Sequence, residues 1–226
     1  MNVPIDPEYP LARFIDQTLL RPAATVDEVI AAAESAAGHG FAAFCVAPCY
    51  VKDVAPILRG STVAVDTVIG FPLGFQTTTV KLFEAEEAVR LGAEEIDLVC
   101  NRGWVRSGRD EFVEIELRTI AEAVSPVPLK VILETSDLTP EEVLRVCEIA
   151  ARAGPEFVKT STGFFGAGAE LDTVRAIKDR MGSLVKVKAS GGIRDLKTAW
   201  AFIQAGAHRI GTSSGMEIMK EFSLLK

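Results

Sequence analysis

Eight short runs of apolar and β-branched residues recur along this chain, and a stretch with helical periodicity follows each of them. The runs occupy residues 12–18, 42–48, 62–70, 94–101, 129–135, 156–162, 184–190 and 208–213. The helical patterns lie at residues 25–38, 49–59, 77–91, 109–124, 139–153, 169–181, 195–205 and 214–222. Eight alternating strand–helix units predict an α/β protein with a closed (β/α)8 barrel of the TIM type. We expect one domain over residues 1–226, with residues 1–10 as an extension before the barrel.

An open, doubly wound sheet is the alternative arrangement for such an alternation. That fold usually carries a G-x-G-x-x-G turn after its first strand, and no such turn follows residues 12–18. The chain has 226 residues, of which 48% are hydrophobic, so it is long enough for the single large core of a barrel. The sequence therefore favours the closed barrel.

Local signals mark several helix ends. Thr25 and Thr139 each precede acidic residues, and Pro140 follows Thr139, as is typical of helix N-termini. Glycine in a left-handed conformation commonly ends a helix. The glycines expected at such ends are Gly38, Gly92, Gly154, Gly182 and Gly206.

Charge and cysteine content narrow the classes of function. The formal net charge of −7 disfavours nonspecific binding to nucleic acid or to an anionic membrane. No apolar run of 18 residues exists, and the N-terminal residues lack the pattern of a secretory signal. The four cysteines form no C-x-x-C pair, and only two histidines are present. We therefore expect buried free thiols, no metal site and a reducing, cytoplasmic location.

Charged residues recur at the inward-facing positions of the expected strands. Side chains alternate along a strand, so one set faces the barrel interior while the other, such as Ile96 and Leu98, packs against helices. The inward set contains Asp16, Asp66, Asp97, Lys130, Glu134, Lys159, Lys186 and Lys188. Barrel interiors usually hold branched apolar residues, and an unpaired buried charge is strongly destabilising. The set is therefore either a paired ionic core that only stabilises the barrel or an active site at the C-terminal ends of the strands.

Two of the inward lysines suggest amine chemistry. A lysine with an ordinary pKa of about 10.4 is almost fully protonated at neutral pH, but a second ammonium group and an apolar pocket lower that pKa. The neutral amine then attacks a carbonyl and forms a Schiff base, while a carboxylate such as Asp97 moves protons. These arguments do not decide whether Lys159 or Lys188 is the nucleophile.

Glycine-rich turns follow three of the late strands. They are Thr162-Gly163, Ser190-Gly191-Gly192 and the segment 211–215, which reads GTSSG. Backbone N–H groups in such turns and at helix N-termini favour anions, and barrels often bind a phosphate after strands 7 and 8. Together the turns predict a phosphate site, to which Arg194 could add a charge.

Six motifs, taken in their order and spacing, resemble one enzyme family. They are VIGFPLG, EIDLVCN, LKVILET, FVKTSTGF, VKASGGIR and RIGTSSG. They look like those of deoxyribose-phosphate aldolase, a class I (Schiff-base) aldolase, and the similarity runs from about Asp16 to Gly215. The resemblance implies reversible cleavage of 2-deoxy-D-ribose 5-phosphate to D-glyceraldehyde 3-phosphate and acetaldehyde, a step of deoxyribose phosphate catabolism.

The resemblance also implies a role for each matching residue. Lys159 would form the Schiff base, Lys188 would lower its pKa and take part in proton transfer, and Asp97 would donate and accept protons. Asp16 would serve in proton relay or in binding a substrate hydroxyl. The phosphate and substrate hydroxyls would contact Thr162, Gly163, Gly191, Gly192, Ser213 and Ser214. The protonated imine is the electron sink, so the resemblance implies neither metal nor organic cofactor, and it suggests a homodimer or homotetramer.

Some positions depart from the family pattern. Gln17 stands where many members have histidine, Ala47 where asparagine is common, and Asp195 where threonine or serine is common. Asn101 begins a segment, NRGW, that differs from the usual one, and Glu170 replaces a frequent threonine. Two alternatives to the family activity stay open at this point: a Schiff-base aldolase for another phosphorylated aldehyde, and a phosphosugar-binding barrel without turnover.

Overall fold

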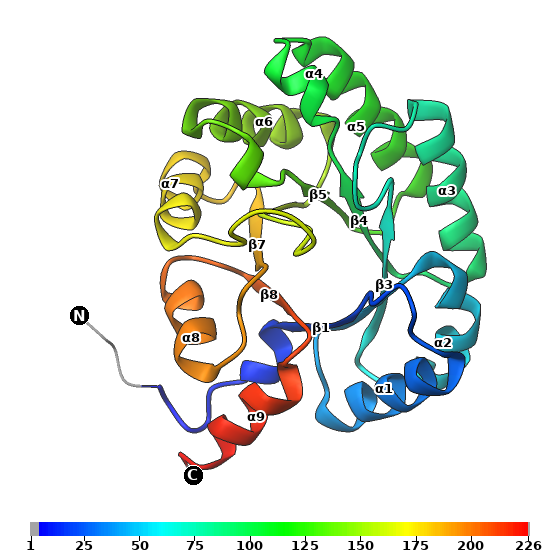
Figure 1. Ribbon diagram of the computed structural model, residues 1–226, viewed down its shortest axis with the longest axis vertical. Helices are drawn as coiled ribbons and strands as arrows, with labels where there is room; N and C mark the ends of the chain where they lie inside the picture. Colours follow the sequence, from blue (N-terminus) through cyan, green and yellow to red (C-terminus); the bar gives the residue numbers. More distant parts are fainter. Residues whose placement is uncertain (1–4, 226) are drawn as a thin grey trace.

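Eight parallel strands close into a barrel in the order of the sequence (Figure 1). The computed structural model describes residues 5–225. The strands are β1 (Ile15–Leu19), β2 (Ala43–Val46), β3 (Ala64–Ile69), β4 (Glu95–Val99), β5 (Leu129–Ile132), β6 (Phe157–Lys159), β7 (Lys186–Ser190) and β8 (Arg209–Thr212). The barrel closes where β1 pairs with β8, with Asp16 opposite Gly211. The predicted TIM barrel is thus confirmed, and the alternative of an open, doubly wound sheet is wrong.

Helices surround the barrel on its outer face (Figure 1). They are α1 (Val26–His39), α2 (Val51–Leu58), α3 (Thr78–Leu91), α4 (Arg102–Arg106), α5 (Asp110–Val124), α6 (Pro140–Ala153), α7 (Leu171–Met181), α8 (Leu196–Gln204) and α9 (Gly215–Ser223). Three short 3-10 segments, Leu11–Phe14, Pro48–Tyr50 and Thr135–Asp137, lie at strand ends. None of the described helices is long and apolar enough to cross a membrane.

The predicted elements agree with the structure except at a few ends. Residues 12–14, expected as strand, belong to the 3-10 turn before β1. Helix α4 was not predicted, because five residues are too few to show a periodicity; Asn101 caps it by accepting from the Trp104 N–H at 3.2 Å. The assignment of residues 1–10 as an extension stays a prediction, and residues 1–4 lie outside the described part.

Capping explains where several helices begin and end. Thr25 and Thr139 are N-caps, as predicted, and each also forms a reciprocal capping box with the glutamate three residues later. Helix α1 ends at Gly40, which has a φ of 63°, rather than at the predicted Gly38. Gly38 lies inside the helix because the left-handed turn occurs two residues later. Asp195 accepts from the Thr198 N–H at 2.8 Å and so caps α8.

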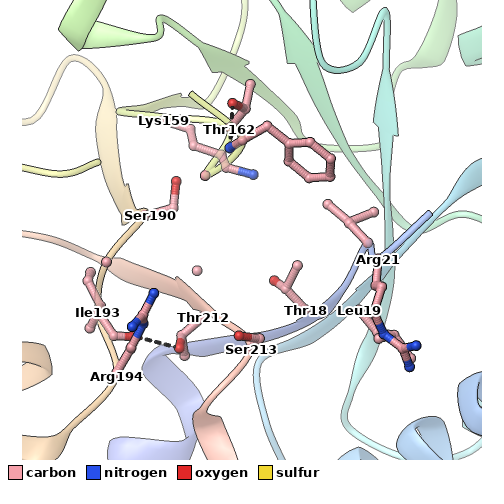
Figure 2. Close-up of a pocket in the computed structure, with 16 residues that line it drawn as sticks. Thr18, Leu19, Arg21, Lys159, Thr162, Ser190, Ile193, Arg194, Thr212 and Ser213 are labelled. Atoms are coloured by element: carbon pink, nitrogen blue, oxygen red, sulfur yellow. Dashed lines mark hydrogen bonds between the residues drawn. The ribbon is translucent and has the colours of Figure 1, made fainter. Parts of the chain in front are cut away.

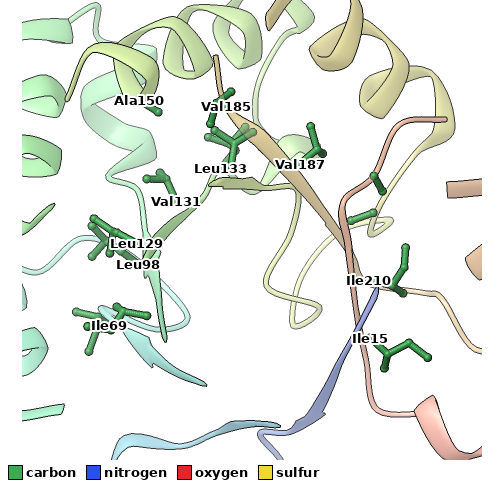
Figure 3. Packing of buried hydrophobic residues seen from close by; sticks show 14 of the residues in the cluster. Ile15, Ile69, Leu98, Leu129, Val131, Leu133, Ala150, Val185, Val187 and Ile210 are labelled. Carbon is green, nitrogen blue, oxygen red and sulfur yellow. The ribbon is translucent and has the colours of Figure 1, made fainter. Parts of the chain in front are cut away.

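The main apolar core lies between the strands and the helices. Val131 and Leu133 of the β5 segment, Val187 of β7 and Ile210 of β8 point outward into this layer (Figure 3). Full burial of a side chain of this kind contributes about 1.5–3 kcal/mol relative to exposure. Because this outer layer supplies the apolar burial, the barrel interior can hold charged groups.

Three of the expected positions need correction. Lys186 is not enclosed: its side chain is 49% exposed and pairs with Glu156 at 2.5 Å, because it lies at the open N-terminal end of β7. Glu134 is buried but follows β5 instead of lying in it, with a left-handed backbone at φ 56°. Among the free cysteines Cys45, Cys100 and Cys147 are buried, whereas Cys49 is exposed.

Candidate active site

One carboxylate contacts three lysines inside the barrel. Asp97 Oδ2 accepts hydrogen bonds from Lys159 Nζ at 2.7 Å and from Lys188 Nζ at 2.8 Å. Asp97 Oδ1 accepts from Lys130 Nζ at 2.8 Å. The side chains of Lys130, Lys188 and Asp97 are fully buried. Asp97 therefore links the two lysines that the sequence singles out.

Strand register brings these groups together. Asp97 on β4 lies opposite Lys130 on β5, and Lys159 on β6 lies opposite Lys188 on β7. Neighbouring strands are about 4.8 Å apart, and side chains at matched positions point to the same face. Four consecutive strands thus present one carboxylate and three amines to the same region of the interior.

Further carboxylates neutralise the amines. Lys188 Nζ lies 2.6 Å from Asp16 Oδ2 and 3.0 Å from Asp66 Oδ2. Lys130 Nζ lies 3.0 Å from Asp66 Oδ1 and 2.9 Å from Glu95 Oε2. We call the whole set the lumen ion cluster, which consists of Asp16, Asp66, Glu95, Asp97, Lys130, Lys159, Lys188 and Arg209.

Arg209 completes the cluster at the N-terminal side of the barrel. Its guanidinium group donates to Asp16 Oδ1 at 2.6 Å and to Glu95 Oε1 at 3.0 Å. With it, four cations face four carboxylates, so the formal charges balance. Sequence reasoning did not single out Arg209, although the alternation along β8 is the signal that could have found it.

The cluster shifts the proton affinities of its members. Burial by itself raises the pKa of the Asp97 carboxyl, but Lys130, Lys159 and Lys188 outweigh burial and hold this pKa well below its usual range. Burial likewise lowers the pKa of Lys188, but the carboxylates of Asp16, Asp66 and Asp97 outweigh it and hold this pKa well above its usual range. Burial raises the pKa of Asp66, and the neighbouring Asp97 raises it further. In the resting protein Asp97 is an anion and Lys188 a cation.

Lys159 differs from the other two lysines in its access to the cavity. Within residues 5–225 it has a single carboxylate partner, Asp97, and its side chain is 4% exposed, whereas those of Lys130 and Lys188 are 0% exposed. Figure 2 shows its amine directed into a cavity of about 420 Å³ at the C-terminal ends of the strands. Lys130, Lys188, Asp97 and Asp16 do not line that cavity and lie buried beside it.

The glycine-rich turns line the same cavity as Lys159. Its wall includes Thr162, Gly163, Gly191, Gly192 and Ser213, together with Arg194 (Figure 2). Ser214 does not line it but precedes α9, and its N–H donates to Thr212 Oγ1 at 2.9 Å. Gly191 and Gly192 have φ values of 91° and 80°, which favour glycine. Helices α8 and α9 begin just after these turns, so the wall suits an anion.

Gln17 of β1 forms hydrogen bonds with the turn after β8, which is part of this wall. Its Nε2 donates to the Ser213 carbonyl at 3.2 Å, and its Oε1 accepts from the Gly215 N–H at 2.9 Å. A Cβ atom at Gly215 would lie 2.4 Å from that oxygen, so a larger residue there would displace the Gln17 side chain. Gln17, one of the departures from the family pattern, therefore holds the turn that carries Ser213 and Ser214.

Two groups of acidic and thiol side chains come close enough together to resemble metal sites. Their members are Cys45, Asp66 and Asp97 in one, and Asp16, Asp66 and Glu95 in the other, within the described part of the chain. The carboxylates of both groups already contact the amines of Lys130 and Lys188. The carboxylate donors of both groups are thus engaged by the protein's own cations, which leaves only the Cys45 thiol.

Known proteins are similar to this chain in both sequence and fold. A family model described as "DeoC/LacD family aldolase" matches residues 3–221. A deoxyribose-phosphate aldolase of Streptococcus mutans is 47% identical over 208 residues, which cover 92% of this chain and 94% of the relative. A solved aldolase structure with 45% identity superposes with a TM-score of 0.91 over 94% of this chain and 95% of its own. A tetrameric deoxyribose phosphate aldolase from Aeropyrum pernix is 35% identical, with a TM-score of 0.88 over 96% and 92% of the two chains.

Proposed function

The chain belongs to the DeoC/LacD family of aldolases, and from this premise we propose that it is a deoxyribose-phosphate aldolase that works through a Schiff base on Lys159. It reversibly cleaves 2-deoxy-D-ribose 5-phosphate to D-glyceraldehyde 3-phosphate and acetaldehyde. The observation that carries the mechanism is that Lys159 lines the cavity while sharing the Asp97 carboxylate with Lys188. The other two interior lysines are enclosed by carboxylates, so neither has an amine free to meet an aldehyde.

The first step is attack of the neutral Lys159 amine on the aldehyde carbon of the open-chain sugar. A C–N bond forms, the carbonyl oxygen takes up protons and leaves as water, and a protonated imine remains. Lys188 supports this step because its carboxylate neighbours keep it protonated beside the reacting nitrogen. Asp97 bridges the two nitrogens and so provides a route for protons between them.

Cleavage follows when the hydroxyl on C3 of the sugar loses its proton. The C2–C3 bond breaks and its electron pair forms a C1=C2 double bond, while the π pair of the C=N bond moves to the Lys159 nitrogen; the products are an enamine and glyceraldehyde 3-phosphate, which departs. Protonation of the enamine and hydrolysis of the new imine release acetaldehyde. Lys159 carries a positive charge as the protonated imine and loses it in the enamine, so one of the three cations that hold down the Asp97 pKa disappears only after the C2–C3 bond has broken.

The phosphate end of the sugar is bound by the glycine-rich wall. Gly191, Gly192 and Ser213 line the cavity, and α8 and α9 begin after them, which supports their backbone N–H groups as the phosphate ligands. Thr162 and Gly163 continue this wall toward Lys159, and Ser214 precedes α9. Asp16 acts from behind the cavity by holding Lys188 at 2.6 Å.

The reaction as proposed needs no metal and no organic cofactor, because the protonated imine on Lys159 is the electron sink. We place the enzyme in the cytoplasm, which is supported by four free cysteines. We also propose a homodimer or homotetramer. Exposed Val80 and Phe83 on α3 and the tetrameric relative from Aeropyrum pernix support that assembly, and light scattering during size-exclusion chromatography measures it.

Reductive trapping tests the proposed function directly. Borohydride treatment in the presence of acetaldehyde should leave an ethyl group on Lys159, identified by peptide mass spectrometry. Lys159→Ala should abolish the modification, while Lys52→Ala, at an exposed position of α2, should leave it intact. Trapping that survives in Lys159→Ala would contradict the assignment of the nucleophile. Comparison of deoxyribose 5-phosphate with other phosphorylated sugars tests the substrate.

A further inference from the structure

Glu134 has an unusual backbone and an unusual environment at the rim of the active site. Among residues 5–225 it is the only non-glycine residue with a positive φ, with φ 56° and ψ 66°. L-residues rarely adopt this conformation, so the surroundings must hold Glu134 in place. Its side chain is completely buried, and within the described residues it forms no ion pair with lysine or arginine. A buried acid without a counter-ion calls for an explanation.

The carboxylate of Glu134 holds the loop that follows the proposed nucleophile. Its Oε2 accepts from the Thr162 backbone N–H at 3.2 Å and also from the Thr162 hydroxyl. Thr162 lies three residues after Lys159 and lines the same cavity. The second oxygen, Oε1, is buried and has no hydrogen-bond partner. Glu134 therefore uses one oxygen to fix both the backbone and the side chain of Thr162.

This contact sets which hydrogen bonds Thr162 can offer to a substrate. A threonine hydroxyl has one hydrogen to donate and two lone pairs to accept. The hydrogen goes to Glu134, and one lone pair accepts the Phe164 N–H at 3.1 Å. Only a lone pair remains for the cavity. Thr162 thus accepts from a substrate hydroxyl and has no hydrogen left for an unprotonated phosphate oxygen.

We infer that Glu134 is a positioning residue that orients the Thr162 hydroxyl as an acceptor, and that this pair selects acceptor aldehydes carrying a hydroxyl next to the carbonyl. The inference rests on the proposed function and adds a specificity determinant to it. Glyceraldehyde 3-phosphate carries such a hydroxyl on C2, between the aldehyde that meets the Lys159 enamine and the phosphate. Thr162 lines the cavity next to Lys159, and the glycine-rich turn of Gly191 and Gly192 lines the same cavity.

The test compares two acceptors in the synthesis direction, with acetaldehyde as donor. One is glyceraldehyde 3-phosphate, and the other is 3-oxopropyl phosphate, which lacks only the C2 hydroxyl. The measured quantity is the kcat/KM for glyceraldehyde 3-phosphate divided by the kcat/KM for 3-oxopropyl phosphate. Glu134→Gly removes the carboxylate and suits the left-handed backbone, and it should lower the ratio roughly tenfold, the value of one hydrogen bond. Thr162→Val should lower it by a similar factor, whereas Thr162→Ser should keep it.

Two further variants separate orientation from stability. Glu134→Gln retains an oxygen that accepts from Thr162 and should restore most of the ratio. Glu116→Gln, a matched change of a buried carboxylate on α5 away from the cavity, should lower the melting temperature without changing the ratio. If Glu134→Gly does not fold, the contrast between Thr162→Val and Thr162→Ser and the value for Glu134→Gln still decide the matter.

An unchanged ratio in folded Glu134→Gly, or in Thr162→Val, overturns the inference. In the double variant Glu134→Gly/Thr162→Val the two decreases in the ratio should not add, because both changes remove the same contact. Additive decreases would also overturn the inference. Trapping of acetaldehyde on Lys159 is the separate check. If the wild-type enzyme is not trapped, the proposed function fails; if it is trapped and the ratio does not respond, only the role of Glu134 and Thr162 fails.

Discussion

Two buried lysine–carboxylate pairs in this molecule have almost the same geometry and different surroundings. Lys81 of α3 contacts Glu116 of α5 at 2.7 Å, and Lys159 contacts Asp97 at 2.7 Å. Lys81 also donates to the Val99 carbonyl at 3.0 Å, and Glu116 accepts from the Thr78 hydroxyl. The first pair is closed, because its remaining polar contacts are made by the protein. The second is open, since its lysine faces a cavity and its carboxylate is shared.

The difference shows that burial of a charge pair does not by itself indicate chemistry. A pair such as Lys81–Glu116 joins two helices to the end of β4 and is strongly destabilising when only one partner is removed. The pair at Lys159 also holds a second and a third amine on the same carboxylate, and one of the three amines, that of Lys159, faces the cavity. Sharing of the carboxylate and access to the cavity separate Lys159, the proposed nucleophile, from Lys81.

The strongest test of this comparison removes the open lysine. Lys159→Ala should lower kcat/KM for deoxyribose 5-phosphate by at least about 10⁴-fold, because the nucleophile is lost. The melting temperature should change little by comparison, since Asp97 keeps Lys130 and Lys188 as partners. Steady-state kinetics and calorimetry measure the two effects. A fold that collapses without Lys159 would make this pair structural as well.

Removal of the closed lysine should have the opposite profile. Lys81→Met leaves Glu116 buried without a counter-ion and should lower the free energy of unfolding by about 3–5 kcal/mol. Urea titration provides this measurement. In the folded fraction, borohydride should still trap acetaldehyde on Lys159. Loss of trapping in folded Lys81→Met would show that the two pairs are coupled through β4.

Lys188 tests the sharing of the carboxylate. Lys188→Leu should lower kcat/KM roughly hundredfold to thousandfold, because a positioned proton donor beside Lys159 is lost. It should also change the shape of the pH–rate profile, which reports the groups that titrate together around Asp97. A variant with wild-type rates over the whole pH range would remove Lys188 from the mechanism.

Acid should affect the two pairs in opposite directions, and this is the smallest effect. The pKa of Asp97 is lowered in the folded state, so its stabilisation is present above its unfolded pKa and is lost as the pH falls through the folded value. Burial raises the pKa of Glu116 above its usual value despite the Lys81 ammonium, so folded Glu116 gains stability relative to the unfolded chain as the pH falls. Each unit of difference in pKa corresponds to about 1.4 kcal/mol.

Unfolding experiments between neutral pH and pH 3 measure the two slopes. Asp97→Asn should make the acid limb of stability shallower, and Glu116→Gln should make it steeper. Slopes that change in the same direction in both variants would contradict the comparison. The absolute stability of each variant is a separate quantity, because both changes also disturb a buried pair.

Alternation along the chain was sufficient to predict the barrel and most of its inward charges. Asp97, Lys130, Lys159 and Lys188 were identified because each breaks an apolar run at an inward position. The same rule placed Lys186 inward, but position along the strand also matters, and the open N-terminal end leaves that side chain in solvent. Alternation predicts which face of a strand a side chain points to, but it does not predict how far along the barrel axis, and so how deeply buried, that side chain lies.

Residues outside regular strands were harder to predict. The role of Glu134 depends on a left-handed backbone after β5 and on a contact with Thr162, 28 residues later. Neither feature has a periodic signal in the sequence. Residues alone left Lys159 and Lys188 equivalent, because the choice between them depends on how many carboxylates surround each amine.

Closure of β1 on β8 also has a consequence for biosynthesis. Lys188 contacts Asp16 near the start of the chain, and Arg209 joins Asp16 to Glu95. A ribosome-bound chain that ends before β8 has therefore already made Lys159 without the surroundings that complete its site. The Lys159 amine acquires its full set of neighbours only after β8 has left the exit tunnel. The proposed Schiff-base site therefore forms only once β8 has joined the barrel.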